Sequence, residues 1–401
     1  GLDYDEGPFY QTQRFDRYRE VLQQLLHSGG AYYCYCTREE LDTLREEQKV
    51  RKDKPRYDGR YRDYAGPPRD GVEPVVRFRN PLNGEVVVDD LIHGRIAFQN
   101  AELDDLIIAR ADGTPTYNFC VVVDDMDMGI THVIRGDDHI NNTPRQINIL
   151  KALGVPVPEY AHVPMILAPD GRKLSKRTGA ASVMEYRDLG YLPEAVLNYL
   201  VRLGWSHGDQ EVFSLDEMSE LFDLADCNKA PSAINPSKLI WLNKHYMKTL
   251  DPVHVARHLS WHLGQLAIDP SAGPPLAEVV RAFADRSDTL KDLAQAAAFL
   301  YREFATYDEK AAHKHLNTAA ATVLRQLSEA FTALPDWRAE PIHETIKQIA
   351  EAGGLALGKV AQPLRVAVTG TAVSPPIDGT LELLGRVKTL VRIERALAQI
   401  G

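Results

Sequence analysis

The sequence predicts a protein of the α/β class that carries a small α+β insert and ends in an all-helical region. β-type and helical segments alternate between residues 116 and 167. Strand patterns then nearly disappear after Val183, and Ala- and Leu-rich helical periods continue to the end. With 401 residues the chain is also too long for one compact core, so we expect about two to four domains.

The composition is that of an ordinary globular protein, with 44% hydrophobic and 25% charged residues. The formal net charge of -10 argues against a protein that coats nucleic acid indiscriminately, although local patches can still bind phosphate. No stretch approaches the roughly 20 apolar residues of a membrane span. The four cysteines (Cys34, Cys36, Cys120 and Cys227) are too few and too unevenly spaced for a disulfide framework. We therefore expect a cytoplasmic protein without a membrane partner.

The first 110 residues predict two helices and four short strands. Apolar residues recur at helical spacing from Thr12 to Ser28, and Gly29-Gly30 ends this run. A second helix is expected after Thr37, because Glu40 three residues later completes a capping box. Residues 51–70 are basic and rich in turn residues, and they predict an exposed loop. Strand patterns follow at 75–79, 85–92, 94–99 and 105–110, so this region is expected to form the α+β insert.

The next segment predicts the parallel sheet. "TYNFCVVVDDMDMG" (116–129) is an almost continuous apolar run, as expected of a strand that is buried on both faces. "THVIRGDDH" (131–139) predicts the next strand, and residues 142–154 predict a helix with Pro144 in its first turn and Gly154 as its stop. "HVPMIL" (162–167) then closes a βαβ unit.

Two groups of polar residues are expected at the carboxyl ends of these strands, where open α/β sheets bind ligands. The first is the run of Arg135, Gly136, Asp137, Asp138 and His139. The second is the turn "GRKLSKRTG" (171–179), which holds Lys173 and Lys176 between two glycines. Lysine ammonium groups on flexible stems can follow negative charge that moves during a reaction, as on a departing pyrophosphate. The alternative is a solvated surface loop.

The order of residues in this turn favours a role in binding phosphate over a solvated surface loop. "KLSKR" (173–177) resembles the Lys-Met-Ser-Lys-Ser signature of class I aminoacyl-tRNA synthetases, in the form common in the glutamyl branch. The stretches 115–146, 161–167, 186–206 and 358–370 also resemble bacterial glutamyl-tRNA synthetases, in the same order along the chain. This resemblance covers essentially the whole sequence.

The resemblance implies a Rossmann-type catalytic domain with an acceptor-binding insert, followed by a helical anticodon-binding region. The implied boundaries are 1–15 for a remnant of the first catalytic half, 16–118 for the insert, 119–170 for the second catalytic half, 171–250 for the stem-contact region and 251–401 for the anticodon-binding region. The family also carries a His-x-Gly-His signature after its first strand, and these 401 residues contain none. We therefore expect further residues upstream in the intact protein.

The resemblance also implies roles for particular residues. Lys173 and Lys176 are the implied catalytic cations, and with Ser175 they contact the ATP phosphates. The other implied contacts are Asp138 and His139 near the adenosine, Met165 and Ile166 with backbone groups toward adenine, and Arg135 and Tyr117 at the substrate glutamate. A guanidinium can form two parallel hydrogen bonds with a carboxylate, which supports the role of Arg135. Without the resemblance, Arg135 could equally form an ion pair with Asp137 or Asp138, and Tyr117 could be a core aromatic residue.

Basic residues in two regions are candidates for tRNA contacts. In the insert these are Arg51, Lys52, Lys54, Arg56, Arg60 and Arg62, interleaved with Tyr57, Tyr61 and Tyr64. Phosphate contacts and base stacking on aromatic rings are what recognition of an acceptor end requires. A solvated basic loop is the alternative. In the carboxyl region, Lys359 and Arg365 of "GKVAQPLRVAVTG" are implied to contribute to anticodon recognition.

A metal site is not expected. Cys34 and Cys36 form half of a tetrahedral zinc site, which some bacterial relatives complete with a Cys-x-His pair. Tyr61 and Asp63 stand at the matching place here, and they are a poor complement to two thiolates. We therefore predict no structural zinc, whereas ATP implies Mg²⁺ as the companion of its phosphates.

The function implied is activation of L-glutamate by ATP and its transfer to tRNA-Glu, by a monomeric enzyme. Three alternatives stay open: a glutaminyl-tRNA synthetase, a shorter paralogue that glutamylates a modified base, and a non-catalytic tRNA-binding protein. The sequence does not indicate whether tRNA-Gln is also a substrate.

Overall fold

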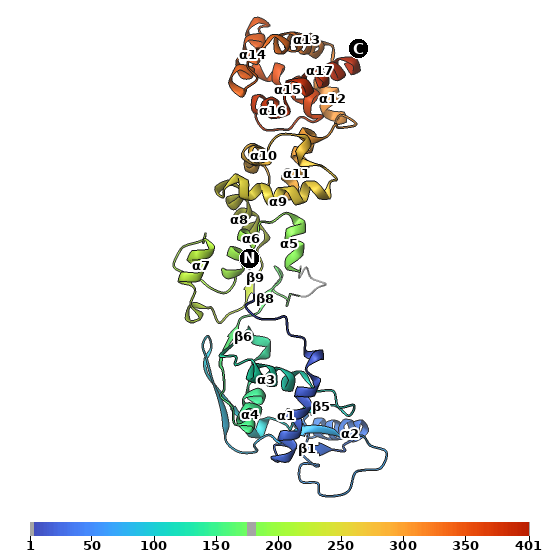
Figure 1. The fold of residues 1–401 in the computed structure, drawn as a ribbon, viewed down its shortest axis with the longest axis vertical. Coiled ribbons are helices and arrows are strands. Elements are labelled where there is room, and N and C mark those ends of the chain that lie inside the picture. Colours follow the sequence, from blue (N-terminus) through green and yellow to red (C-terminus); the bar gives the residue numbers. More distant parts are fainter. Residues whose placement is uncertain (1–3, 175–181, 401) are drawn as a thin grey trace. The chain divides into compact units, whose positions relative to one another are not determined.

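The computed structural model describes residues 4–174 and 182–400, and the chain divides into two compact units. The first unit comprises Gly1–Leu167, Gly204–Gly208 and Leu221–Ser232. The second comprises Ala168–Leu203, Asp209–Glu220 and Ala233–Gly401. Figure 1 shows strands concentrated in the first unit and helices in the second.

The two amino-terminal helices form where the sequence predicts them. Helix α1 (Phe15–His27) has one apolar face, on which Tyr18, Val21, Leu22 and Leu25 are buried. Helix α2 (Arg38–Val50) begins with the predicted capping box, in which the Thr37 side chain accepts a hydrogen bond from the Glu40 backbone N–H and the Glu40 carboxylate accepts one from the Thr37 N–H.

The strands of the first unit form two sheets. Strands β1 (Ala31–Cys34), β2 (Val75–Phe78) and β5 (Ile107–Ala109) make an antiparallel sheet in the order β1-β2-β5. Strands β3 (Glu85–Asp90), β4 (Gly94–Gln99), β6 (His132–Gly136) and β7 (Glu159–Val163) make a mixed sheet in the order β4-β3-β7-β6. The β3–β4 hairpin, which the sequence analysis grouped with the insert, thus extends the sheet that contains β6 and β7.

The predicted βαβ unit is confirmed. Strands β6 and β7 are parallel, with Arg135 opposite His162, and helix α4 (Thr143–Leu153) connects them. Pro144 lies in the first turn of α4, and Gly154 ends the helix in the left-handed region at a φ of 70°. The expected strand at 162–167 is divided at Pro164 and Met165: His162 and Val163 end β7, and Ile166–Leu167 forms the short strand β8. Strand β8 lies beside β9 (Ser232–Ala233).

The prediction of a strand at 116–129 is wrong. These residues form helix α3 (Tyr117–Asp127), on which Phe119, Cys120, Val122 and Val123 are buried. A continuous apolar run is compatible with a buried helix as well as with a buried strand, so periodicity could not separate the two.

Ion pairs hold α3 against α1, and they explain the acidic end of this segment. The Asp124 carboxylate accepts hydrogen bonds from Arg14 at 2.7 Å and from the Tyr18 hydroxyl at 2.9 Å. Asp127 pairs with both Arg14 and Arg17. These bonds join residues about a hundred positions apart, so the sequence alone did not reveal them.

The core of the first unit lies between α1, α3, α4 and the β1-β2-β5 sheet. A smaller apolar cluster of Val86, Val88, Ile147 and Tyr160 packs α4 against the mixed sheet. Between the sheets, the buried Asn148 amide donates to the side-chain oxygens of Asn80 at 2.8 Å and Asn100 at 2.9 Å. A buried amide with both donors satisfied fixes the position of α4.

The second unit is helical, as predicted. Its helices are α5 (Val183–Leu189), α6 (Pro193–Val201), α7 (Leu215–Leu221), α8 (Pro236–Thr249), α9 (Pro252–Gln265), α10 (Leu276–Phe283), α11 (Leu290–Tyr301), α12 (Glu309–His315), α13 (Thr318–Ala333), α14 (Ala339–Ala352), α15 (Leu357–Thr369), α16 (Ile377–Leu384) and α17 (Arg386–Ile400). The last residue of α7, Leu221, is assigned to the first unit. Helices α13 to α17 pack around one another near the carboxyl terminus (Figure 1).

Buried polar side chains join helices of this unit. The Arg392 side chain on α17 is only 1% exposed; its guanidinium pairs with Glu303 at 2.9 Å and donates to the carbonyl oxygens of Val368 at 2.6 Å and Phe299 at 2.8 Å. The Asn243 amide on α8 accepts from the Leu192 N–H and donates to the Asp288 carbonyl, each at 2.8 Å. Removing one partner of such a hydrogen bond destabilises a fold when the other partner stays buried and unsatisfied.

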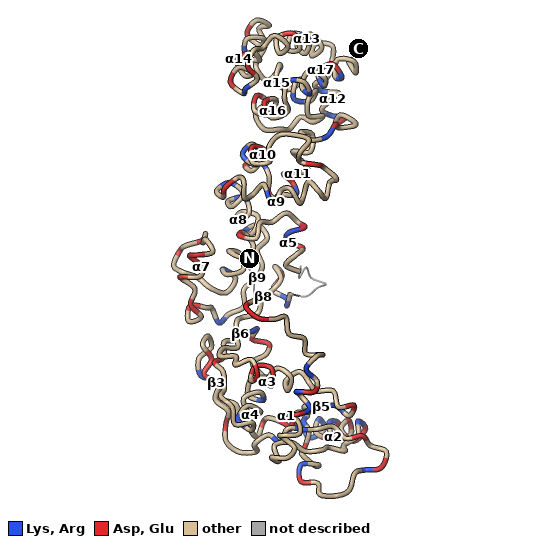
Figure 2. Tube along the Cα trace, viewed as in Figure 1, with Lys and Arg blue, Asp and Glu red and all other residues tan. Residues whose placement is uncertain are grey.

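Charged residues of both signs are interspersed along the chain (Figure 2). Within residues 4–174 and 182–400, no helix is long and apolar enough to cross a membrane.

We predict that the helical unit loses stability in mild acid through His262 on α9. This side chain is 5% exposed, and burial lowers its pKa from 6.5 to about 4, although Asp188 opposes the shift. Between these pH values the unfolded chain binds a proton that the folded chain does not, so the free energy of unfolding falls as the pH drops from 6.5 towards 4. The full effect is on the order of 3 kcal/mol. Urea unfolding followed by helical circular dichroism at pH 7 and pH 5 measures the part of this effect that develops above pH 5, about 2 kcal/mol.

His262→Leu should reduce the difference between the two pH values, whereas the matched change His313→Leu at an exposed histidine should not. An unchanged pH dependence in His262→Leu would contradict this assignment.

Candidate functional site

Arg135 lies at the carboxyl end of β6, and neighbouring strands and helices orient its guanidinium. The Nη2 donates to Thr143 Oγ1 at 2.8 Å, and the Nε donates to His162 Nε2 at 3.3 Å. The guanidinium carbon also lies 5.6 Å from the centre of the Tyr160 ring. An arginine has five N–H donors in a fixed plane, so two anchored donors still leave others to meet a ligand carboxylate.

His162 can orient Arg135 because Asp90 fixes its tautomer. The Asp90 carboxylate accepts hydrogen bonds from His162 Nδ1 at 2.6 Å and from its backbone N–H at 3.1 Å. With Nδ1 protonated, the lone pair of the neutral ring is on Nε2, where the Arg135 Nε–H and the Thr143 hydroxyl can both donate. Burial lowers the pKa of His162, which outweighs the attraction of Asp90 and keeps the ring neutral.

Asp90 is itself held in its charged form. Burial by itself would raise the pKa of this carboxyl group, but hydrogen bonds from the backbone N–H groups of His93 and Ile92 and from His162 outweigh that effect and lower it. The side chains of Asp90 and His162 are 0% and 1% exposed. The buried Asp90 carboxylate therefore accepts four hydrogen bonds from the protein, and these stabilise its charge without water.

Two further groups set the electrostatics around Arg135. Burial raises the pKa of Asp125 on α3, and Arg135 partly offsets the shift. Burial also raises the pKa of Tyr160 to about 12. The Arg135 guanidinium is thus near the Asp125 carboxyl group, whose charged form is disfavoured by burial, and near the Tyr160 phenol, which stays protonated at neutral pH.

Sequence reasoning missed Asp90, Thr143 and His162. Asp90 and His162 lie at or near the carboxyl ends of two parallel strands, as Arg135 does, so the rule that found Arg135 could also have found them. The sequence did not indicate that the 85–99 hairpin belongs to the same sheet.

Tyr117 and His139 face each other beside this group. Their ring centres are 5.8 Å apart with the planes tilted by 46°, and Tyr117 is 50% exposed, so it is not a core aromatic residue. The Asp138 side chain lies over the backbone of this turn, since its Oδ1 is 2.8 Å from the place that a Cβ on Gly136 would occupy. His139 Nδ1 lies 3.1 Å from the Asn142 amide nitrogen.

The backbone predicted to meet adenine lies at the break between β7 and β8. The Met165 carbonyl accepts a hydrogen bond from Ser232 N–H at 3.3 Å, and Ile166 begins β8. A carbonyl oxygen has two lone pairs, so the Ser232 bond leaves room for a second donor.

The structure describes the cationic turn only in part. Lys173 is exposed and belongs to the second unit, and Arg172 before it pairs with Asp170 at 3.0 Å. Ser175 and Lys176 lie outside the described residues.

The basic residues of the insert separate into two groups. Arg62 is structural, because it pairs with the buried Asp105 at 2.6 Å and donates to the Asn80 carbonyl at 2.7 Å. The others lie at the surface: Arg51 pairs with Asp53, Arg60 pairs with Asp58, and Lys52, Lys54 and Arg56 are exposed. The surface group is accessible to an RNA backbone, whereas the Arg62 guanidinium is already engaged by Asp105 and Asn80.

The cysteine pair is packed against aromatic rings. The Cys34 thiol is 3.4 Å from the Tyr57 hydroxyl, and burial raises the pKa of Cys36 to about 11. Tyr61 packs against Tyr35 and Tyr64, with ring centres 6.1 and 5.2 Å apart. Among the residues that the structure describes, no group of three His, Cys, Asp or Glu side chains could hold a metal ion.

In the carboxyl region, α15 carries one exposed and one partly buried cation. Lys359 is exposed, whereas the Arg365 Nε donates to Ser374 Oγ at 2.9 Å. Burial lowers the pKa of Arg365, and the nearby Arg286 adds to this shift.

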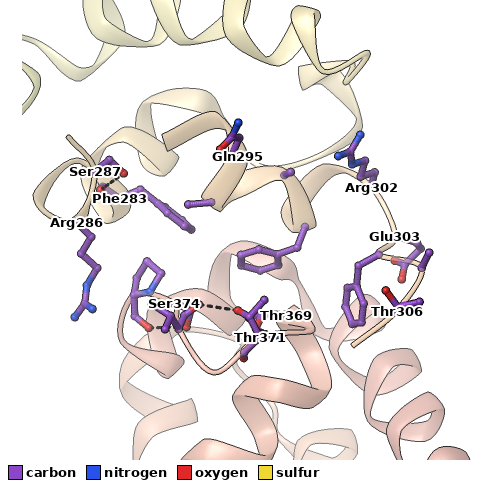
Figure 3. A pocket seen from close by; sticks show the side chains of 17 residues that line it. Phe283, Arg286, Ser287, Gln295, Arg302, Glu303, Thr306, Thr369, Thr371 and Ser374 are labelled. Carbon is purple, nitrogen blue, oxygen red and sulfur yellow. Dashed lines mark hydrogen bonds between the residues drawn. The ribbon is translucent and has the colours of Figure 1, made fainter. Parts of the chain in front are cut away.

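Beside Ser374 a cavity of about 730 Å³ lies between α10, α11 and the 369–375 segment (Figure 3). Its lining combines aromatic rings of Phe283, Phe299 and Phe304, hydroxyl groups, and the cations Arg286 and Arg302. Flat apolar walls with hydroxyl and guanidinium groups suit a nucleic-acid base and its phosphate.

Two family models together match nearly the whole chain. The model described as "tRNA synthetases class I (E and Q), catalytic domain" matches residues 1–241, and the model described as "Anticodon binding domain" matches residues 254–397. These matches and the mixed sheet followed by helices confirm the predicted fold class.

Relatives of the same kind are similar over almost the full sequence. The chain is 63% identical over 397 residues to "Glutamate--tRNA ligase 1" of Alkalilimnicola ehrlichii, covering 99% of this chain and 84% of that protein. It is 63% identical over 400 residues to "Glutamate--tRNA ligase 1" of Nitrosococcus oceani, covering 100% and 85%. The crystal structure of a glutamate tRNA ligase from Elizabethkingia meningosepticum matches with a TM-score of 0.80 at 31% identity, covering 99% of this chain and 86% of that one. The chain therefore belongs to the family of class I tRNA synthetases (E and Q).

Proposed function

We propose that this chain is a glutamate–tRNA ligase, which activates L-glutamate with ATP and transfers the glutamyl group to tRNA-Glu. The observation that carries the proposal is Arg135, a guanidinium fixed by His162 and Thr143 at the edge of a mixed sheet whose fold belongs to this family. A carboxylate ligand gains two charge-assisted hydrogen bonds from such a group. The helical carboxyl region favours this function over the glutaminyl alternative, which typically ends in β-barrels, and its length disfavours the shorter paralogue.

In the first step, an oxygen of the glutamate α-carboxylate attacks the α-phosphorus of ATP, and the bond to pyrophosphate breaks. Arg135 is proposed to bind the substrate glutamate, with Tyr117 closing the same pocket. Asp138 and His139 are proposed to lie near the adenosine, and Met165 and Ile166 near adenine. Lys173 and Lys176, with Ser175, are proposed to stabilise the negative charge on the departing pyrophosphate.

In the second step, a ribose hydroxyl of the terminal adenosine of tRNA attacks the glutamyl carbonyl, and AMP leaves. Mg²⁺ would share the phosphate charge when ATP is bound. Proteins usually hold this ion through substrate phosphates and one or two carboxylates.

The tRNA is proposed to contact two regions. Arg51, Lys52, Lys54, Arg56 and Arg60 of the insert are the proposed contacts of the acceptor end. Lys359 and Arg365 are the proposed contacts of the anticodon loop, and the cavity beside Ser374 offers walls against which a base can lie. We propose that the protein acts as a monomer in the cytoplasm.

We predict that Lys176→Ala in the intact protein collapses glutamate-dependent ATP–pyrophosphate exchange measured in the presence of tRNA. The ammonium group would be lost where charge develops in the transition state, and a single such donor is worth roughly 100- to 1,000-fold in rate. Affinity for tRNA should stay nearly unchanged. Exchange that survives within a few-fold would show that Lys176 does not have this role.

We predict that Arg135→Lys raises the KM for glutamate by roughly 10- to 100-fold, because lysine cannot form two parallel bonds with a carboxylate. The KM for ATP should change little. Steady-state aminoacylation of tRNA-Glu measures both constants, and Arg95→Lys at an exposed position of β4 is the matched control. Equal effects on glutamate and ATP would argue against a carboxylate contact.

We predict that Asp90→Asn raises the KM for glutamate more than it lowers kcat. The carboxylate accepts hydrogen bonds on both oxygens, whereas an amide has one acceptor oxygen and one NH2 donor. Either the His162 side or the backbone side of Asp90 therefore loses its acceptor, and the orientation of the imidazole that accepts from Arg135 is weakened. Asp89→Asn, at the exposed neighbouring position of β3, should leave the KM unchanged. If thermal stability falls in Asp90→Asn while the KM for glutamate stays constant, Asp90 is only structural.

A further inference from the structure

Asn142 stands at the start of helix α4, directly before Thr143, but it does not act as a usual helix cap. An asparagine in this place normally has an extended backbone, and its side-chain oxygen accepts a hydrogen bond from an N–H of the first turn. The Asn142 backbone is already helical, with φ at -83° and ψ at -31°, and among the described residues its side chain accepts no such bond. The Asn142 amide is therefore available for another partner.

That partner is His139, in the turn after β6. The Asn142 amide nitrogen lies 3.1 Å from His139 Nδ1. An amide NH2 group can donate but cannot accept, so Nδ1 is the acceptor and the neutral imidazole carries its proton on Nε2. The Asn142 backbone N–H also donates to the His139 carbonyl at 2.8 Å, so the backbone holds the two side chains in register.

The two histidines of the site thus have opposite tautomers. Asp90 accepts from Nδ1 of His162, which leaves a lone pair on Nε2 for Arg135. Asn142 donates to Nδ1 of His139, which leaves an N–H on Nε2. One imidazole is therefore set to accept a hydrogen bond and the other to donate one.

The Nε2–H of His139 can reach a ligand. The His139 side chain is 35% exposed, and its Nε2 lies 3.9 Å from Asp138 Oδ1, which is beyond hydrogen-bond distance. The Tyr117 ring lies beside the imidazole, with the ring centres 5.8 Å apart. His139 thus presents an N–H donor next to the residue that is proposed to close the glutamate pocket.

We propose that Asn142 is a positioning residue for ATP, which fixes His139 as the Nε2–H tautomer so that this group donates a hydrogen bond to an oxygen of the nucleotide. The proposal rests on the proposed function, which places the adenosine beside His139. Thr143 follows Asn142 in the chain, and its hydroxyl accepts from Arg135 at 2.8 Å. Adjacent residues at one helix end thus orient groups for the two substrates.

The kinetic test substitutes Asn142→Ala in the intact protein and measures the KM values for ATP and glutamate by pyrophosphate exchange in the presence of tRNA. A hydrogen bond is worth roughly 2- to 12-fold in an equilibrium constant, so we expect the KM for ATP to rise about fivefold and the KM for glutamate to change less than about twofold. Asn141→Ala, at the exposed neighbouring position, is the matched control and should keep both constants.

A double-mutant cycle shows whether Asn142 acts through the imidazole. His139→Phe keeps a ring beside Tyr117 but removes both ring nitrogens. Adding Asn142→Ala to this variant should raise the KM for ATP no further. A second rise of the same size would overturn the proposal, because Asn142 would then act by another route. A lower melting temperature in Asn142→Ala with an unchanged KM for ATP would also overturn it, leaving Asn142 as a structural residue of α4.

Nitrogen NMR of the histidine rings tests the tautomer without any substrate, at about pH 8, where an ordinary imidazole is neutral. The His139 signals are identified by their loss in His139→Phe. We expect them to show a protonated Nε2 in the unaltered protein and a mixture of tautomers in Asn142→Ala. A protonated Nδ1 in the unaltered protein would overturn the assignment. Absence of glutamate-dependent pyrophosphate exchange in the unaltered intact protein would overturn the proposed function and with it the ATP contact, whereas the tautomer result would stand.

Discussion

The candidate site depends on one buried interaction, the hydrogen bond between the Asp90 carboxylate and His162 Nδ1 at 2.6 Å. This bond sets the tautomer of the neutral His162 imidazole, whose Nε2 in turn accepts a hydrogen bond from the Arg135 Nε–H. Neither Asp90 nor His162 is accessible to solvent, so their geometry is set before any substrate arrives. Preorganised donors of this kind cost little reorganisation when a charged ligand binds.

The mixed sheet is what brings these residues together. Asp90, Arg135 and His162 come from three strands, of which β3 and β6 both flank β7. Helix α4 adds Thr143 and is fixed from its other side by the Asn148 amide. The packing that stabilises the first unit therefore also positions the groups that are proposed to bind glutamate.

The sequence predicted the capped helices, the βαβ unit and the helical carboxyl region, because capping residues and apolar periodicity are local signals. It failed at α3, where a buried helix and a buried strand share the same apolar run. It found Arg135 from its place after a strand, but it missed Asp90, because the parallel pairing of β3 with β7 is a long-range contact. It also counted Arg62 with the RNA-binding cations, although the guanidinium of that residue pairs with the buried Asp105.

The central claim is that the Arg135 guanidinium, oriented by its hydrogen bond to His162, binds the substrate glutamate. A crystal structure of this protein with bound glutamate tests it most directly. The account predicts a glutamate carboxylate within hydrogen-bond distance of Arg135, with the Arg135–His162–Asp90 contacts intact. A glutamate bound elsewhere, or an Arg135 turned away from His162 in the complex, would contradict it.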